Sequence, residues 1–445
     1  MASDLLSIAV SGARAARGAL DVTAQNIANA SSDGYTRRSL RLEEVSAAGG
    51  VGRVGDISLS GARIAEIRRN ADPFLQGEVR RTGGDLARAN VELKGLSNME
   101  TALEQSGVYD AMVEFEASLQ QLAGDPVDPA RRAAVLGEAE TLASKFNITA
   151  NGFDAVRDGL QFDAVAEVSE ANIIGQEIAR INLRMNRAGP GSSDRASLLD
   201  QRDLMLEKLS GLTSVTTSFA ADGTVAVSLG DPARSFVNGG TSSQLTIATA
   251  ADGTLTFDID GQDMKPTSGS LGGANLALTE LANVRSRLDK LAESFATTLN
   301  AAQANGAALD GSPGQPLFSG TTAGTLKVVL QSGNGLATAP AGSPAGSRDP
   351  GNLEALRQAL KADDPIQGVS SLLFDVSSKV AGRTVTQNAL ETIASTARIS
   401  LVQQSGVDLD AEAANLIRFQ QAFQASGRAM QTASDIFDTL LGIGR

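Results

Sequence analysis

The chain contains 445 residues, none of them cysteine, histidine or tryptophan, and its 51 acidic and 38 basic side chains give a net charge of −13. The missing residue types exclude disulfides, thiolate or imidazole catalysis, and metal sites built on cysteine. The acidic balance argues against a nucleic-acid partner, whose phosphates would be repelled. Hydrophobic residues make up 42%, enough for packed cores, and the length allows roughly two to four domains.

We expect neither a membrane span nor a cleaved signal peptide in the N-terminal segment. No run approaches the roughly 18 apolar residues that a transmembrane helix requires. Asp4 stands where a signal peptide has basic residues, and Arg14 and Arg17 interrupt the apolar run. We therefore expect no membrane insertion, and an export route that does not depend on a cleaved signal peptide.

The first predicted element is a helix over residues 3–30 with a seven-residue repeat. One column of this repeat contains Leu6, Ala13, Leu20 and Ile27. Small residues beside that column would let another backbone approach closely. Up to Arg81 the chain carries 11 arginines and 9 acidic residues, a net charge of +2, and we expect residues 35–81 to form an irregular arm.

Helical spacing returns after the arm. Apolar residues predict a helix over 84–122, one long helix or two over 130–187, and a further helix over 194–209. The breaks between them are an Asp/Pro-rich stretch at 125–129 and a Gly-Pro-Gly stop at 189–191.

The character of the chain changes at about residue 212. Residues 212–262 alternate apolar and polar side chains and contain three Asp-Gly pairs, at 222, 252 and 260, which predict β-hairpins. A helix follows over 276–300, then an irregular Gly/Pro-rich segment with one expected strand at 326–330. Helices over 352–361 and 366–404 complete this part.

The C-terminal helix, over 409–441, has the most regular pattern. One seven-residue column contains Leu409, Leu416, Phe423, Met430 and Phe437. A second column contains Phe419, Ala433 and Leu440, but also the polar Glu412 and Ser426. Such a repeat predicts supercoiling around a partner helix, and the N-terminal helix is the obvious candidate. We expect Asp408, Asp410 and Glu412 to be solvated and to complement the helix dipole.

These elements predict an α+β fold with discontinuous domains. The terminal segments 1–34 and 405–445 would form a coiled coil. Residues 35–211 and 276–404 would form a mainly helical domain, in which the placement of 319–350 is open. Residues 212–275 would be an inserted antiparallel β-domain.

Candidate chemical sites are few, and we expect no catalytic residue, cofactor or metal. Residues 258–263 resemble a calcium loop only superficially, because the glycine and the final acid are misplaced, so a hairpin is favoured. Tyr35 and Tyr109 are expected to be partly buried packing residues. For the cluster Arg37, Arg38 and Arg41 two interpretations stay open, a solvated arm or ion pairs to the acidic surface of a neighbouring subunit.

Both ends of the chain resemble flagellar axial proteins, the family of rod, hook and hook-associated subunits. The N-terminal motif of that family is matched here by Asn26, Asn29, Gly34, Tyr35 and Arg37. Residues 405–426 are similar to its C-terminal GVNLDEExxNLxxYQQAYQAS, with phenylalanine replacing both tyrosines.

Two internal stretches resemble the hook-associated members of the family in particular. Residues 198–210 are similar to their LLDQRDxLLxxLS motif, and residues 299–318 match a second motif. Gln303 stands where relatives often have histidine, which indicates that this position is not catalytic.

The resemblance implies a structural subunit of the extracellular flagellum, exported unfolded through the flagellar type III apparatus. The absence of cysteine would prevent disulfides during that transit. Its implied partners are copies of itself in a helical tube, hook protein, a filament-side hook-associated protein, and a cytoplasmic chaperone at the C-terminal helix.

Two alternatives remain. Another axial protein, such as a hook or distal rod subunit, is disfavoured by residues 198–210 and 405–412. A carboxylate-based glycan hydrolase would need two carboxyl groups close together in a cleft, one with a raised pKa, and the sequence places no such pair. We therefore expect a structural protein and not an enzyme.

Overall fold

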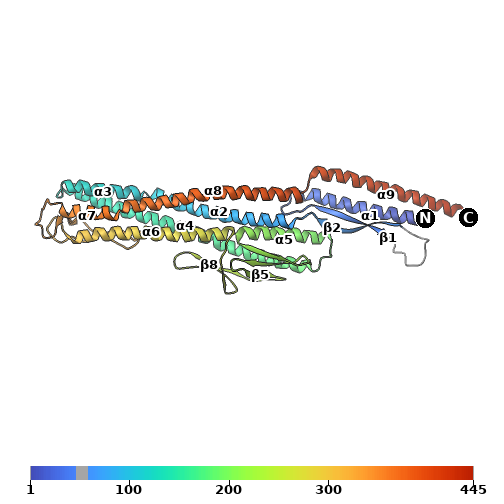
Figure 1. Cartoon of the computed structure of the whole chain (residues 1–445), viewed down its shortest axis with the longest axis horizontal. Coiled ribbons are helices and arrows are strands. Elements are labelled where there is room, and N and C mark those ends of the chain that lie inside the picture. Colours follow the sequence, from blue (N-terminus) through green and yellow to red (C-terminus); the bar gives the residue numbers. More distant parts are fainter. Residues whose placement is uncertain (1, 47–58, 444–445) are drawn as a thin grey trace.

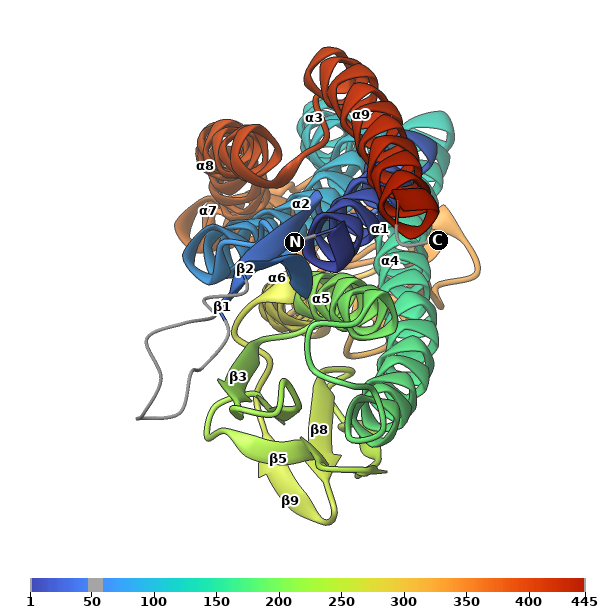
Figure 2. The same ribbon diagram turned by 90° about the vertical axis from the view of Figure 1, so that its right-hand side faces the viewer.

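The structure, a computed structural model, describes residues 2–46 and 59–443, with side chains over 5–44 and 61–439. These residues form a long rod with a smaller β unit on one side (Figure 1). The two ends of the chain lie together at one end of the rod. Viewed along the rod, the β unit projects away from the helices (Figure 2). The composition is mainly helical with small antiparallel sheets, as an α+β fold requires.

Long helices run along the rod. Their bounds are α1 (Ala2–Ala28), α2 (Pro73–Ser106), α3 (Val108–Gly124), α4 (Pro129–Met185), α5 (Ser193–Leu212), α6 (Gly269–Ala304), α7 (Gly351–Asp363), α8 (Pro365–Ser405) and α9 (Leu409–Ile443). Asp72 and Asp128 cap α2 and α4 in the same way, because each carboxylate accepts hydrogen bonds from first-turn amides and a proline follows it.

The helical predictions are confirmed with one correction, and the open choice between one helix and two over 130–187 is resolved. Residues 129–185 form one helix, and the helix expected over 84–122 is divided at Gly107, whose φ of +68° suits glycine. The prediction of an irregular arm over residues 35–81 is wrong where the structure describes it. Strands β1 (Arg38–Ser46) and β2 (Leu59–Arg69) pair antiparallel as a hairpin, and α2 begins at Pro73. Residues 47–58 of the predicted arm lie outside the described residues. Contact with α1 stabilises this hairpin.

The β unit contains two antiparallel sheets. Their strands are β3 (Val215–Phe219), β4 (Val225–Leu229), β5 (Arg234–Asn238) and β6 (Thr241–Ser242), then β7 (Leu245–Thr249), β8 (Leu255–Ile259) and β9 (Gln262–Met264). All three Asp-Gly pairs lie in hairpin turns, and residues 258–263 form the β8–β9 hairpin, as predicted. Asn172 and Asn182 of α4 hold the unit by pairing with both the N–H and the C=O of Leu245 and Val225.

The segment after α6 is irregular, as expected. Its short elements are β10 (Gly306–Ala307), β11 (Phe318–Ser319), β12 (Lys327–Val328), η1 (Gly333–Gly335) and β13 (Ala339–Pro340). The strand predicted at 326–330 is therefore shorter than expected. Buried Arg132 organises the segment by donating to the carbonyl of Leu336 at 2.8 Å and to Thr338 Oγ1 at 2.7 Å. Gln303 is also structural, because its Oε1 accepts from the amide of Ala337 at 2.7 Å.

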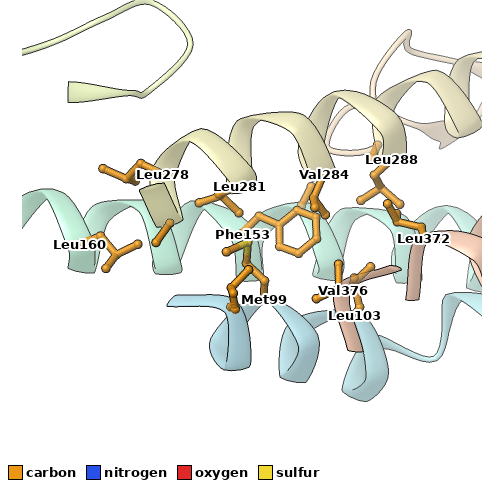
Figure 3. Close-up of a cluster of buried hydrophobic side chains, with 14 of the residues drawn as sticks. Met99, Leu103, Phe153, Leu160, Leu278, Leu281, Val284, Leu288, Leu372 and Val376 are labelled. Carbon is orange, nitrogen blue, oxygen red and sulfur yellow. The ribbon is translucent and has the colours of Figure 1, made fainter. Parts of the chain in front are cut away.

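An apolar core runs through the rod between α2, α4, α6 and α8. Figure 3 shows side chains from these four helices converging around Phe153. Towards the end of the rod far from the chain termini, Phe115, Phe295 and Phe318 pack edge to face or tilted, with centroids 5.6 to 6.5 Å apart. The body thus closes an apolar core within one chain, although some large apolar side chains of α4 and α8, such as Phe162 and Phe374, remain exposed.

Candidate functional site

The first and last helices lie side by side and run in opposite directions at one end of the rod (Figure 1). The side of α1 that is buried consists mainly of alanines, among them Ala9, Ala16 and Ala19. The two backbones approach closely at Gly12, where an added Cβ would lie 3.0 Å from Oγ of Ser426. We refer to α1 and α9 together as the terminal pair.

Within the single chain, the predicted column of α1 is only partly covered. Ala13 is buried and Leu20 is half-buried, whereas Leu6 and Ile27 are exposed. The buried face is therefore shifted towards the small residues. An assembly role for Leu6 and Ile27 stays a prediction, since a second chain would be needed to cover them.

On α9 the two seven-residue columns differ in burial. Glu412 and Ala433 of the second column are buried, and Phe419 is half-buried. In the first column Leu416 and Met430 are half-buried, but Leu409, Phe423 and Phe437 are 54%, 42% and 50% exposed. Leu440 lies outside the residues whose side chains are described. The terminal pair therefore presents an apolar stripe to solvent.

A cluster of buried ion pairs lies at the base of the terminal pair. This cluster, here called the joint, consists of Arg38, Arg69, Asp200, Arg202 and Asp203. Asp200 accepts from Arg38 and Arg69, both at 2.8 Å, and Asp203 accepts from Arg69 at 2.9 Å. The joint thereby connects the β1–β2 hairpin to α5.

The joint also reaches the β unit through Arg202. Its Nη1 donates to the carbonyl of Gly223 at 2.7 Å, and its guanidinium lies 4.7 Å from the centroid of the Phe219 ring. Burial favours the neutral form of Asp203, but the charges of Arg202 and Arg69 outweigh it and lower the pKa of this carboxyl. A general acid of a glycan hydrolase would need the opposite shift.

The residues of the N-terminal motif shape the turn after α1. Asn26 pairs with both the N–H and the C=O of Arg38, at 3.0 and 2.9 Å, and accepts from the Tyr35 hydroxyl at 2.9 Å. Burial raises the pKa of that hydroxyl. Gly34 has a φ of +74°, which favours glycine, and a Cβ added there would make a tight contact of 3.1 Å with Cβ of Leu204. Asn29 donates to the carbonyl of Gln25.

Arg37 connects this turn to α9. Its Nε donates to Oε1 of Glu412 at 2.7 Å, and its amide donates to the carbonyl of Ser405 at 2.9 Å. Solvation of Glu412 is therefore a wrong prediction, since only 1% of this residue is exposed. Asp408 does cap α9, because it accepts from the amides of Asp410 and Ala411.

Two members of the arginine cluster, Arg37 and Arg38, follow neither interpretation, whereas Arg41 is exposed as the solvated interpretation expects. Arg37 and Arg38 form ion pairs with Glu412 and Asp200 of their own chain. They are therefore neither a solvated arm nor left unpaired for the acidic surface of a neighbouring subunit. Arg41 is exposed on the hairpin, 3.5 Å from Glu66. Tyr35 is half-buried as expected, whereas Tyr109 is exposed.

Sequence reasoning missed the joint, although its acids lie in the motif at 198–210. No spacing links Asp200 to Arg38, because 161 residues separate them in the chain. Among the residues described, no three acidic side chains lie close enough together to hold a metal ion. No helix in the described ranges has the length and apolar content to cross a membrane.

Comparison with protein families matches three separate parts of the chain. The helical domain of the flagellar hook-associated protein FlgK matches residues 95–318. The flagellar basal body rod FlgEFG protein C-terminal model matches residues 400–443, and the flagella basal body rod protein model matches residues 6–36. The two rod models thus fall on the terminal pair, and the FlgK model falls on half of the chain.

Relatives with curated names align with this chain over most of its length. The flagellar hook-associated protein 1 of Bacillus subtilis is 24% identical, over 97% of this chain and 96% of the relative. That of Escherichia coli K12 is 25% identical, over 99% and 100%. That of Salmonella typhimurium is 29% identical over 71% of this chain, and the alignment spans 59% of that relative.

A solved structure, the flagellar hook junction protein FlgK from Burkholderia pseudomallei, aligns with 54% of this chain and 46% of its own, at 26% identity and a TM-score of 0.49. The matched families and relatives are flagellar structural proteins, and none is a catalytic family. On the family match over residues 95–318, the chain belongs to the FlgK family of flagellar hook-associated proteins.

Proposed function

We propose that this chain is the structural subunit that joins hook to filament in the bacterial flagellum, and that it assembles through its terminal pair. The observation that carries this proposal is the exposed apolar stripe of α9, which includes Leu409, Phe423 and Phe437. In a soluble chain such a stripe marks an interaction surface. The rod-protein models match at these same helices.

In this proposal neighbouring copies bury the stripe. Each square ångström of apolar surface removed from water contributes about 25 cal/mol. Part of the stabilisation of α9 would therefore come from assembly rather than from folding of the single chain. The assembly residues would be those of the predicted columns, including Leu6 and Ile27 on α1 and Leu416 and Met430 on α9.

The proposed domains follow the division between the terminal pair and the rest of the chain. Residues 1–34 and 405–445 would form the inner coiled coil of a tube, with residues 35–211 and 276–404 outside it. The β unit, within 212–275, would lie at larger radius. Its projection from the side of the rod supports this placement (Figure 2).

The partners would be copies of this chain, hook protein on one side and a filament-side hook-associated protein on the other. The chain would leave the cytoplasm unfolded through the flagellar type III apparatus and function outside the cell. A cytoplasmic chaperone would cover α9 before export, since an exposed apolar helix otherwise aggregates.

Electron microscopy of a deletion strain tests the junction role. We expect hooks that carry no filaments, with filament protein released into the medium. A strain that lacks hooks would instead support a hook or rod subunit, and normal filaments would contradict both roles.

A truncated chain tests the role of the terminal pair. A chain without residues 409–445 should keep a folded, soluble body, because the core of the rod lies outside α9. It should fail to restore filaments in the deletion strain. Normal incorporation of the truncated chain would contradict assembly through the terminal pair.

A further inference from the structure

Helix α4 presents a stripe of uncharged residues to solvent along the body of the rod. From Ala155 to Gln176 its members recur at alternating spacings of four and three residues, which is typical of a face that packs on another helix. Its large apolar side chains are uncovered, with exposures from 50% for Leu183 to 75% for Phe162, although a surface helix normally presents charges there. We call this stripe the α4 face. It consists of Ile148, Ala155, Gly159, Phe162, Ala166, Ser169, Ile173, Gln176 and Leu183.

Helix α8 carries a second stripe of the same kind. One side of its second half packs on α2, and the other side is exposed. Residues on the exposed side again recur at alternating spacings of four and three, and none of them is charged. Val385 is 70% exposed and Ile399 is 54% exposed. We call this stripe the α8 face. It consists of Val385, Ala389, Thr392, Thr396, Ile399 and Gln403.

The hydroxyl groups of the two faces have partners within their own helices. Thr392 donates to the carbonyl of Asn388 at 3.0 Å, and Thr396 donates to that of Thr392 at 2.8 Å. On α4, Ser169 donates to the carbonyl of Val165 at 3.1 Å. Because these donors are already satisfied, another helix can cover the faces without leaving a hydroxyl donor buried and unpaired.

The two faces lie on different sides of the rod but at the same height. Viewed along the rod, α4 and α8 lie on opposite sides with α2 between them (Figure 2). Both run antiparallel to α2. On α2, Glu92 pairs with Arg383 of α8 at 2.9 Å, and Lys94, two residues later, pairs with Asp163 of α4 at 3.6 Å. The α8 face is therefore level with the part of the α4 face that follows Asp163.

The charges around the two faces are complementary. Residues 148–183, which contain the α4 face, include six acidic and two basic side chains, a net charge of −4. Residues 378–404, which contain the α8 face, include one acidic and three basic side chains, a net charge of +2. The three basic side chains pair with acids of their own chain but remain nearly half exposed; they are Lys379, Arg383 and Arg398. Contact between unlike faces is therefore favoured over contact between like faces.

We propose that neighbouring copies of this chain pack side by side with the α4 face of one copy on the α8 face of the next. Such a contact is heterologous, so each copy uses both faces once, and repetition builds a ring or a helical array. Faces at the same height meet when the copies stand side by side without a shift along the rod. The inference rests on the proposed assembly, but it involves only the body and is additional to burial of the exposed stripe of α9.

Cysteine crosslinking in assembled flagella tests which faces meet, because the chain contains no cysteine of its own. Ser169→Cys and Ala389→Cys each change an exposed residue of one face to a side chain of similar size. Each single variant and the double variant are expressed in the deletion strain, and the isolated flagella are treated with a short bismaleimide. Gel electrophoresis with an antibody against the chain separates monomers from crosslinked products.

The double variant should give a ladder of dimers, trimers and larger products, because every copy is linked to a neighbour on both sides. Each single variant should stay monomeric, because like faces do not meet. Ser169→Cys with Thr256→Cys is the matched control, since Thr256 is exposed on β8 of the β unit, and it should also stay monomeric.

A charge placed on the α4 face gives a second measurement. Ile173→Lys sets a cation against the basic surroundings of the α8 face and should lower the amount of chain in isolated flagella by about tenfold. Because Ile173 is 64% exposed, the free chain should keep its unfolding midpoint. Thr256→Lys is the control and should leave the amount unchanged.

Three outcomes would overturn the proposal. The first is a double cysteine variant that restores filaments without giving a ladder. The second is dimers in either single variant, which would mean that like faces meet. The third is normal incorporation of Ile173→Lys. The junction role fails on a different observation, normal filaments in the deletion strain, so the two failures are distinguishable.

Discussion

The body of the rod closes an apolar core to which no described residue of the terminal pair contributes, although both regions also expose large apolar side chains. The body closes its core with side chains from α2, α4, α6 and α8 (Figure 3). The terminal pair buries small residues in its seam and leaves Phe423 and Phe437 exposed. Under the proposed function, the two regions would complete their packing at different stages, the body on folding and the terminal pair on assembly.

The joint is where these two regions meet, and it is polar where the body is apolar. Charges from the hairpin, α5 and α9 are buried within it or beside it. Buried ion pairs stabilise a fold weakly, but they disfavour every arrangement that separates them. The joint therefore fixes the orientation of the terminal pair relative to the body.

The largest effect on single-chain stability is expected in the body. Phe153→Ala should lower the free energy of unfolding by about 3–5 kcal/mol, because it leaves a cavity in a closed core. Phe162→Ala on the same helix is the matched control, since Phe162 is 75% exposed, and it should change stability by less than about 0.5 kcal/mol. Urea unfolding of both variants measures the difference; equal losses would contradict a closed core at Phe153.

An effect of similar or smaller size is expected in the joint. Asp200→Ala leaves Arg38 and Arg69 without this shared carboxylate and should cost about 3 kcal/mol. Glu66→Ala, which removes an exposed pair with Arg41, should cost no more than about 1 kcal/mol. Chemical denaturation compares the two variants. If Asp200→Ala proved as mild as Glu66→Ala, the joint would not couple the hairpin to α5.

A smaller, pH-dependent effect is expected from Asp203. The folded state lowers the pKa of its carboxyl, so its contribution to stability is present above the unfolded value of about 3.9 and is lost as the pH falls through the folded value. The difference in unfolding free energy between the natural chain and Asp203→Asn should therefore shrink as the pH falls from 7 towards 3. A difference that is constant over this range would contradict the shift.

The sequence predicts the regular elements better than the contacts between them. The Asp-Gly turns of the β unit and the helical character of α4 follow from local patterns, but those patterns left open whether residues 130–187 form one helix or two. The β1–β2 hairpin escapes prediction because its alternation of apolar and charged residues is short, over residues 40–43, and packing on α1 decides its structure. The joint could not be predicted from the sequence because its charged residues lie far apart in the chain.

Glu412 shows most clearly how a local rule fails. In the first turn of a helix an acid is expected to be solvated, and the neighbouring Asp408 obeys that rule. The signal against solvation was the column that Glu412 shares with Phe419 and Ala433, which points at the partner helix. Where a tertiary contact is available, it overrides the local preference.

The contrast between body and terminal pair is tested most directly by the double variant Phe423→Gln with Phe437→Gln. Glutamine preserves helix propensity while removing the aromatic surface. The account predicts that the free chain keeps its unfolding midpoint but is no longer incorporated when it is expressed in the deletion strain, as electron microscopy of the flagella would show. Filaments restored to normal number and length by this variant would contradict it.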